Sequence, residues 1–147
     1  MNRLVKVGGV TFDHSVANLV RHSHDFLIGR LTAEMLRKKF GVFTEDTSST
    51  LRVAGRDMIM GVPIQKDISI SLVRAALKEP LQECIRAVYS LLDRTPPEVR
   101  RAIYKNGIFL TGGIANTPGL EDYIEKAVGI PVRTAVEPDI CAVTGLK

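Results

Sequence analysis

Apolar residues recur at helical spacing in four parts of the chain, which predicts four main helices. The first follows a short strand predicted at residues 3–7, and the second covers residues 31–41 and ends at a glycine. The third is the longest, and Pro80 within it is expected to kink or split it, because proline lacks a backbone donor. The fourth begins after Gly119. The apolar positions are Phe12, Val16, Leu19 and Val20; Thr32, Leu36 and Phe40; Val73, Ala76, Leu77, Leu81, Cys84, Ile85, Val88, Leu91 and Leu92; and Leu120, Tyr123, Ile124 and Ala127.

Between the second and third helices the pattern is that of strands. Residues 51–53, 58–60 and 64–70 predict a meander of short antiparallel strands. Ile68 and Ile70 alternate with polar residues, as on a sheet with one wet face. This region therefore predicts a small α+β piece.

The last third of the chain predicts a different sheet. The run 108–110 is continuously apolar, which favours a buried central strand. Residues 130–134 predict an edge strand, because Pro131 cannot donate to a ladder. With a short helix at 98–105, the order of elements predicts an α/β core carrying an inserted small α+β subdomain.

The stretch 107–120 combines a strand, a glycine turn and a helix start. Gly112 and Gly113 allow a sharp turn and let the backbone approach a bulky group. Thr117 is predicted to cap the following helix, with Pro118 at its first position. Such turns hold nucleotides in many α/β proteins, but a tight turn that serves packing alone has the same pattern.

Glu34 and Arg37 lie three residues apart, so they are expected side by side on one helix face. One interpretation is a surface ion pair worth roughly 0.2–0.5 kcal/mol. The other is functional, because an acceptor and a planar cation on one face could hold a purine and its ribose.

Composition excludes little but is consistent with a soluble globular chain of 147 residues, 45% hydrophobic and 24% charged. The formal charge of +4 permits an anionic ligand. No block of five or six like charges occurs and aromatic residues are only 5%, so no nucleic-acid partner is expected.

The cysteines and the hydropathy pattern indicate a cytoplasmic location, and the histidines do not indicate a metal site. Cys84 and Cys141 are expected to be reduced thiols, since no secretory signal is present. The histidines do not form a convincing metal set. No apolar run approaches the ~18 residues that span a bilayer.

Several motifs, taken in order, resemble the MreB/Mbl family of bacterial actin homologues, over nearly the whole chain and as the second lobe of such a protein. Each motif is common, but seven in register are specific. They are Val7-Gly8-Gly9 with Phe12-Asp13; Thr32-Ala33-Glu34 with Arg37; Val53, Gly55 and Arg56 with Gly61-Val62-Pro63; Glu79-Pro80-Leu81; Pro96-Pro97-Glu98; Leu110-Thr111-Gly112-Gly113; and Gly129-Ile130-Pro131-Val132.

The resemblance implies an actin/heat-shock 70-like ATPase lobe with a ribonuclease H-like core. Residues 1–13 and 72–147 would form its larger subdomain and residues 14–71 the smaller one. It implies ATP as ligand (Mg-ATP in the complete protein), self-association into filaments that direct cell shape, and contact with the wall-synthesis machinery at the membrane. Membrane association would come through the missing lobe or through partners. The phosphate loops would lie before residue 1, so hydrolysis by this chain alone is not expected.

The resemblance also implies a binding site made of two segments, with Glu34 and Gly113 on the same nucleoside. Adenine and ribose would lie against the first segment, where Lys38 could stack on the base. The second would form the adenosine turn. The sequence departs from the family at Ile114, where a third glycine is usual, and at Arg37, where lysine is usual. The implied ligand-binding residues are Glu34, Met35, Leu36, Arg37 and Lys38, with Gly112, Gly113, Ile114, Ala115 and Asn116.

Two alternatives stay open from the sequence. A chaperone-like or assembly-factor ATPase related to heat-shock 70 shares the paired glycines and the acidic and basic helix positions. The short hairpin with Gly55-Arg56 and Gly61-Val62-Pro63 favours MreB instead. The other alternative is an unrelated binding module that takes no nucleotide.

Overall fold

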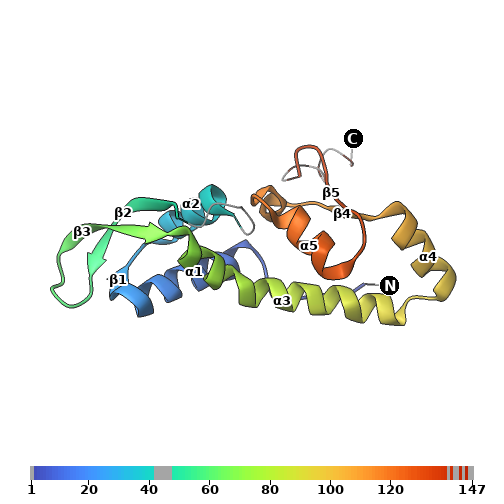
Figure 1. Cartoon of the computed structure of the whole chain (residues 1–147), viewed down its shortest axis with the longest axis horizontal. Coiled ribbons are helices and arrows are strands. Elements are labelled where there is room, and N and C mark those ends of the chain that lie inside the picture. The colour runs from blue at the N-terminus through green and yellow to red at the C-terminus, as the bar shows by residue number, and fades with distance from the viewer. Residues whose placement is uncertain (1, 42–47, 139, 141–142, 144, 146–147) are drawn as a thin grey trace.

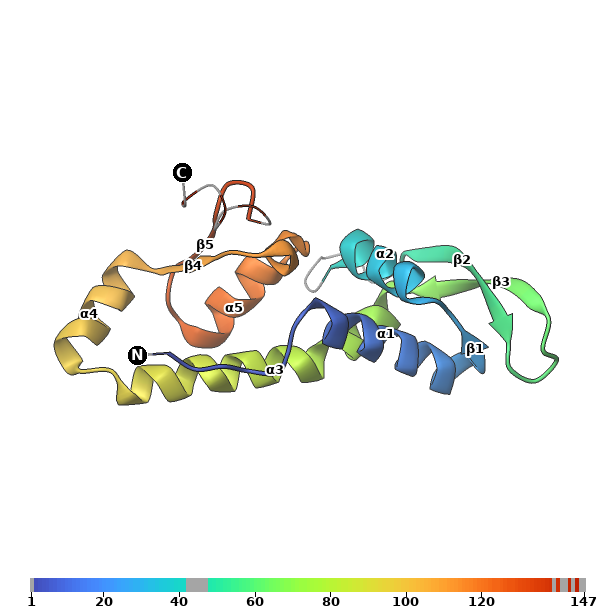
Figure 2. The same ribbon diagram turned by 180° about the vertical axis from the view of Figure 1, so that it is seen from behind.

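The computed structural model describes residues 2–41, 48–138, 140, 143 and 145. The elements are α1 (Gly9–His24), β1 (Phe26–Leu27), α2 (Arg30–Phe40), β2 (Thr50–Asp57), β3 (Pro63–Ser69), α3 (Ile70–Arg94), α4 (Pro97–Asn106), β4 (Ile108–Leu110), the short 3-10 helix η1 (Gly113–Asn116), α5 (Leu120–Val128) and β5 (Val132–Thr134). Helix α3 runs along most of the elongated molecule (Figure 1). Helices α1 and α2 with β1–β3 lie at one end of it, and α4, α5, β4 and β5 at the other (Figures 1 and 2).

The first two predicted helices are confirmed as α1 and α2. Phe12, Val16 and Val20 form the buried face of α1, as their spacing requires. Helix α2 ends at Gly41, whose positive φ of +67° glycine adopts without strain. The strand predicted at residues 3–7 is wrong, because this segment runs beside α3 and pairs with no strand among the described residues (Figure 2).

The predicted meander is a sheet in the order β1-β2-β3, with both pairings antiparallel. The strand predicted at 58–60 is wrong, because these residues form the turn between β2 and β3. The Asp57 carboxylate accepts hydrogen bonds from the backbone N–H groups of Ile59 (2.8 Å) and Met60 (3.1 Å). These bonds lower the pKa of Asp57. They also hold residues 57–60 in a turn, so residues 58–60 are not extended as a strand would be.

Helix α3 is the predicted long helix, and it begins at Ile70, which the sequence pattern had placed in a strand. The Ser69 hydroxyl caps it by accepting from the N–H of Leu72. The helix is not split at Pro80, which lies buried inside it. Packing on both sides of the proline offsets the missing backbone hydrogen bond, since Leu77 and Leu81 are fully buried there.

The second sheet contains β4 and β5, which are parallel, with Ile108 opposite Val132. The prediction that residues 108–110 are a buried central strand is wrong, because Phe109 is 65% exposed. Strand β4 has one partner in the described chain, and Phe109 and Arg133 share the open face of the pair. The predicted edge strand is confirmed, and α5 satisfies its outer N–H groups through Glu121 and Glu125.

The start of α5 differs from the prediction. Its N-cap is Gly119, with φ +77°, and the helix begins at Leu120 rather than at Pro118. The short 3-10 helix η1 begins at Gly113, the second of the paired glycines, and lies before this helix. Thr117 is therefore free of the capping role, and its hydroxyl has a different partner, described below.

Two clusters of buried side chains support the fold. The larger one joins α1, α2, the three-stranded sheet and the first half of α3, and the smaller one joins the end of α3 to α5 and β5. The expected subdomain boundaries fall inside α1 and near the start of α3, so both cross continuous helices. The smaller cluster consists of Leu92, Val128, Ile130 and Val132.

Candidate functional site

The two segments singled out in the sequence line one hollow of about 320 Å³. Helix α2 contributes one wall, the glycine turn contributes the facing wall, and the start of α1 closes the site. This volume is at the lower end of the roughly 300–1,000 Å³ typical of ligand sites. Its charged lining has three cations and two carboxylates, a balance that favours an anionic ligand. The lining residues are Gly9, Val10, Asp13, Arg30, Glu34, Arg37, Lys38, Gly113 and Ile114.

Beneath the hollow, Arg37 joins three parts of the chain. Its Nε donates to the Asp13 carboxylate at 2.8 Å, and its Nη1 donates to the Thr117 hydroxyl at 2.9 Å. The exposed fractions of Arg37, Asp13 and Thr117 are only 4%, 4% and 5%. The predicted surface ion pair between Arg37 and Glu34 is therefore wrong, because the guanidinium turns inward to a buried carboxylate.

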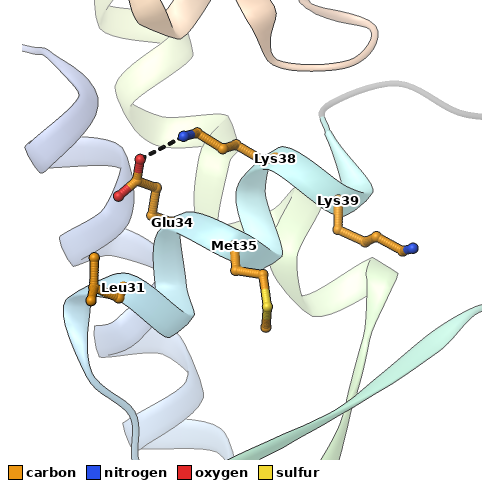
Figure 3. Close-up of a pocket in the computed structure, with 5 residues that line it drawn as sticks. All are labelled: Leu31, Glu34, Met35, Lys38 and Lys39. Carbon is orange, nitrogen blue, oxygen red and sulfur yellow. Dashed lines mark ion pairs between the residues drawn. The ribbon is translucent and has the colours of Figure 1, made fainter.

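Glu34 pairs instead with Lys38, one turn further along α2, at 2.7 Å between Oε1 and Nζ (Figure 3). The hydrogen bond and the charge of Lys38 lower the pKa of Glu34. The carboxylate is therefore ionised at neutral pH and available as an acceptor. Met35 and Lys39 extend in other directions, as Figure 3 shows. With Leu31 they line a neighbouring hollow along the outer side of α2, to which Glu34 and Lys38 also contribute.

The structure brings together half of the predicted site residues. Glu34, Arg37, Lys38, Gly113 and Ile114 line the same hollow. The others do not line it. Met35 lies on the outer side of α2, Leu36 is fully buried in the core, Gly112 bonds through its N–H to the Pro138 carbonyl, Ala115 is buried, and Asn116 is exposed on η1.

Sequence reasoning missed Arg30, Asp13 and Thr117 as parts of the site. Asp13 follows Phe12 directly and precedes Val16 by three residues, so it borders the buried face of α1. A carboxylate in that position needs a partner, because acidic residues are almost never fully buried unless paired. That signal predicts a cation nearby, but not which one. Thr117 carried no such signal, since it also suited a cap.

A second, apolar cavity of about 200 Å³ lies between α3, the N-terminal segment and the glycine turn. Ala115, Leu81 and Cys84 are among its lining residues. Burial raises the pKa of the Cys84 thiol, so the thiol is protonated at neutral pH. Cys141, the other predicted reduced thiol, lies outside the described residues.

The part of the chain that the structure describes has no cluster of three or more histidine, cysteine, aspartate or glutamate side chains that could hold a metal ion. Within the same residues, no helix has the length and apolar character required to span a membrane.

Sequence comparison relates the whole chain to one family. A sequence model of the MreB/Mbl protein family matches residues 1–147. The chain is 34% identical over 142 residues to the cell shape-determining protein MreB of Escherichia coli (strain K12). The aligned region covers 96% of this chain and 41% of that protein. It is 32% identical to the cell shape-determining protein Mbl of Bacillus subtilis (strain 168), covering 96% and 43%. The chain thus spans about two-fifths of the length of these relatives.

Structural comparison gives the same result. The crystal structure of MreB5 of Spiroplasma citri bound to ADP matches with a TM-score of 0.93 and 29% identity, covering 98% of this chain and 44% of that chain. MreB5 bound to AMPPNP matches with a TM-score of 0.92 over the same shares. The MamK double helical filament, at 20% identity and a TM-score of 0.74, covers 92% and 42% and shows the fold alone. The predicted α/β actin-like lobe is confirmed.

Proposed function

Since the chain belongs to the MreB/Mbl family, we propose that it is the adenine-nucleotide-binding second lobe of a filament-forming, cell shape-determining protein. The observation that carries this proposal is the single hollow shared by Glu34 on α2 and Gly113 on the glycine turn. The family match favours this function over the chaperone alternative. The solved MreB5 relatives bound to ADP and AMPPNP add support for the ligand class.

The nucleoside would lie between the two walls. The ionised Glu34 carboxylate would accept hydrogen bonds from the ribose hydroxyls. Gly113 would let the backbone pack on the nucleoside, because nothing lies within 4 Å of the position that a Cβ there would occupy. Ile114 would add apolar contact with the base. Arg30 and Lys38 would face the negative phosphates.

The remaining predicted ligand residues would not contact the ligand directly in this proposal. Leu36 and Ala115 would pack the backs of the two walls, since both are buried. Gly112, Asn116 and Met35 would have no direct ligand contact.

Hydrolysis is not assigned to the chain by itself. Phosphoryl transfer depends on groups that position the attacking water and Mg²⁺. We assign no residue of this chain to the magnesium of Mg-ATP. A steady-state phosphate-release assay on the chain should give no turnover above the buffer rate; turnover at the rate of a full-length relative would contradict this.

The other parts of the proposal follow from family membership. The protein would be cytoplasmic, would associate with further copies into filaments, and would contact the wall-synthesis machinery at the membrane. Residues 1–13 and 72–147 would form the larger subdomain and residues 14–71 the smaller one.

Isothermal titration calorimetry of the 147-residue chain with ATP, ADP and GTP tests the nucleotide site. We expect adenine nucleotides to bind, and Glu34→Ala or Gly113→Val to weaken binding by at least about tenfold, through a lost charged acceptor or a side chain placed in the site. The matched control is Glu98→Ala, since Glu98 is exposed on α4. Unchanged affinity in both site variants, or no binding by the unmodified chain, would refute the proposal.

A further inference from the structure

We propose that Arg37 is a positioning residue that ties the two walls of the hollow together before a ligand arrives, rather than a direct contact to the ligand. The expected effect of Arg37 on nucleotide affinity rests on the proposed function. The contacts by which Arg37 joins the two walls do not depend on it. This positioning role differs from the one that the sequence implied, in which Arg37 binds the nucleoside directly from the surface of α2.

The contacts of the guanidinium support a positioning role. One edge donates to Asp13 on α1, and Nη1 donates to Thr117, which follows the glycine turn and η1 directly. Arginine is suited to this task, because its planar fork presents several donors in fixed directions at once. These two contacts therefore join α1, α2 and the segment after the turn at one buried point.

Burial separates Arg37 from its neighbours on α2. Its side chain is 5% exposed, against 29% for Glu34 and 56% for Lys38. A charge removed from water to this degree needs a compensating partner. Asp13, whose side chain is also 5% exposed, provides one at 2.8 Å. Arg30, Glu34 and Lys38 are thereby left as the accessible charged groups of α2 in the hollow.

A second contact holds the same two walls together. Gly41, at the end of α2, packs so closely on the segment after the turn that an added Cβ would lie 2.1 Å from the Pro118 carbonyl oxygen. Thr117 and Pro118 are adjacent, so the hydrogen bond from Arg37 and the packing of Gly41 act on the same segment. Together they fix the distance between α2 and the glycine turn, which reduces the ordering cost of binding.

The test compares variants that change the hydrogen bond between Arg37 and Thr117 while keeping the charge or the shape of the substituted side chain. Thr117→Val removes the acceptor at nearly constant volume, Thr117→Ser retains it, and Arg37→Lys keeps the charge but loses the fork. Binding of a fluorescent ADP analogue and hydrogen exchange of the amides at 112–117 are measured for each variant. The matched control is Arg52→Lys, because both contacts of Arg52 are exposed, a hydrogen bond to Gln65 at 3.2 Å and an ion pair with Asp67 at 3.9 Å.

We expect Thr117→Val and Arg37→Lys each to weaken binding by about tenfold, as for a lost hydrogen bond to a charged group. The double variant should bind about as well as the weaker single variant, since both changes remove one interaction. Thr117→Ser should rescue binding, and Arg52→Lys should leave it unchanged. Amide exchange at 112–117 should accelerate in Thr117→Val but not in Thr117→Ser.

Other results would overturn the inference. Unaltered binding in Thr117→Val with a loss in Arg37→Lys would mean that Arg37 contacts the ligand directly. Lowered melting temperature with unchanged affinity in both would mean a purely structural contact. If the unmodified chain binds no nucleotide, the proposed function fails and hydrogen exchange decides alone: faster exchange at 112–117 in Thr117→Val supports the tie, and unchanged exchange refutes it.

Discussion

Arg37 on α2 donates from Nη1 to the hydroxyl of Thr117 at 2.9 Å, although 80 residues separate them along the chain. The same guanidinium pairs with Asp13 on α1. Three elements distant in sequence therefore meet at one buried polar point, beneath the hollow that we propose for a nucleotide.

Replacing Arg37 with methionine should destabilise the chain strongly. The change leaves the Asp13 carboxylate buried without its cation, a loss of about 3–5 kcal/mol in the free energy of unfolding. Urea denaturation followed by circular dichroism measures it. Arg52→Met is the matched control and should change stability by less than about 0.5 kcal/mol, because the ion pair of Arg52 is exposed. A loss under about 1 kcal/mol for Arg37→Met would contradict the buried pairing.

Gly41→Ala should destabilise more than Gly61→Ala. Both glycines have positive φ, +67° and +71°, so alanine suffers backbone strain of about 1–3 kcal/mol at either position. Only at Gly41 would the new Cβ also clash, at 2.1 Å from the Pro118 carbonyl, whereas nothing lies within 4 Å at Gly61. Thermal denaturation of both variants provides the comparison, and equal melting temperatures would show that α2 does not pack on residue 118 as described.

Substitution of Lys38 should raise the pKa of Glu34 toward its ordinary value near 4.5, because Lys38 is the main cause of its lowering. A lowered folded-state pKa favours the folded state above pH 4.5, and that contribution is lost as the pH falls through the folded-state pKa. NMR titration of the Glu34 carboxyl carbon in Lys38→Met measures the shift. Lys39→Met is the control and should leave the titration unchanged.

The turn between β2 and β3 should contribute to self-association. Ile59 and Met60 are 79% and 73% exposed, and Asp57 holds them in a fixed turn. Exposed apolar groups that cluster in this way mark contact surfaces. Ile59→Ser with Met60→Ser should lower the sedimenting fraction of the protein while the melting temperature stays the same. A matched pair of serines at Val99 and Tyr104 on α4, also exposed, tests whether the effect is specific to the turn; an equal loss from both pairs would argue against a role for the turn.

Elements fixed by local pattern could be predicted from the sequence. The faces of α1 and α3 follow from apolar residues at helical spacing, and the ends of α2 and α5 follow from Gly41 and Gly129. These features depend on residues three or four positions apart, so the chain alone contains them. The order of the motifs also sufficed to indicate the family.

Tertiary structure decided the features that depend on which partner is within reach. The sequence allowed Arg37 to pair with Glu34 and Thr117 to cap a helix, and both local options were available. Because the Asp13 carboxylate on α1 is buried, the Arg37 guanidinium points inward to pair with it. In that position the guanidinium also donates to the Thr117 hydroxyl. In the same way, Phe109 is exposed because the face of the β4–β5 pair that it shares with Arg133 is not covered by any described element, a fact that its own apolar run cannot encode. Periodicity specifies which face of an element is apolar, but the partner of a buried charge or of a strand edge depends on segments far away in the sequence.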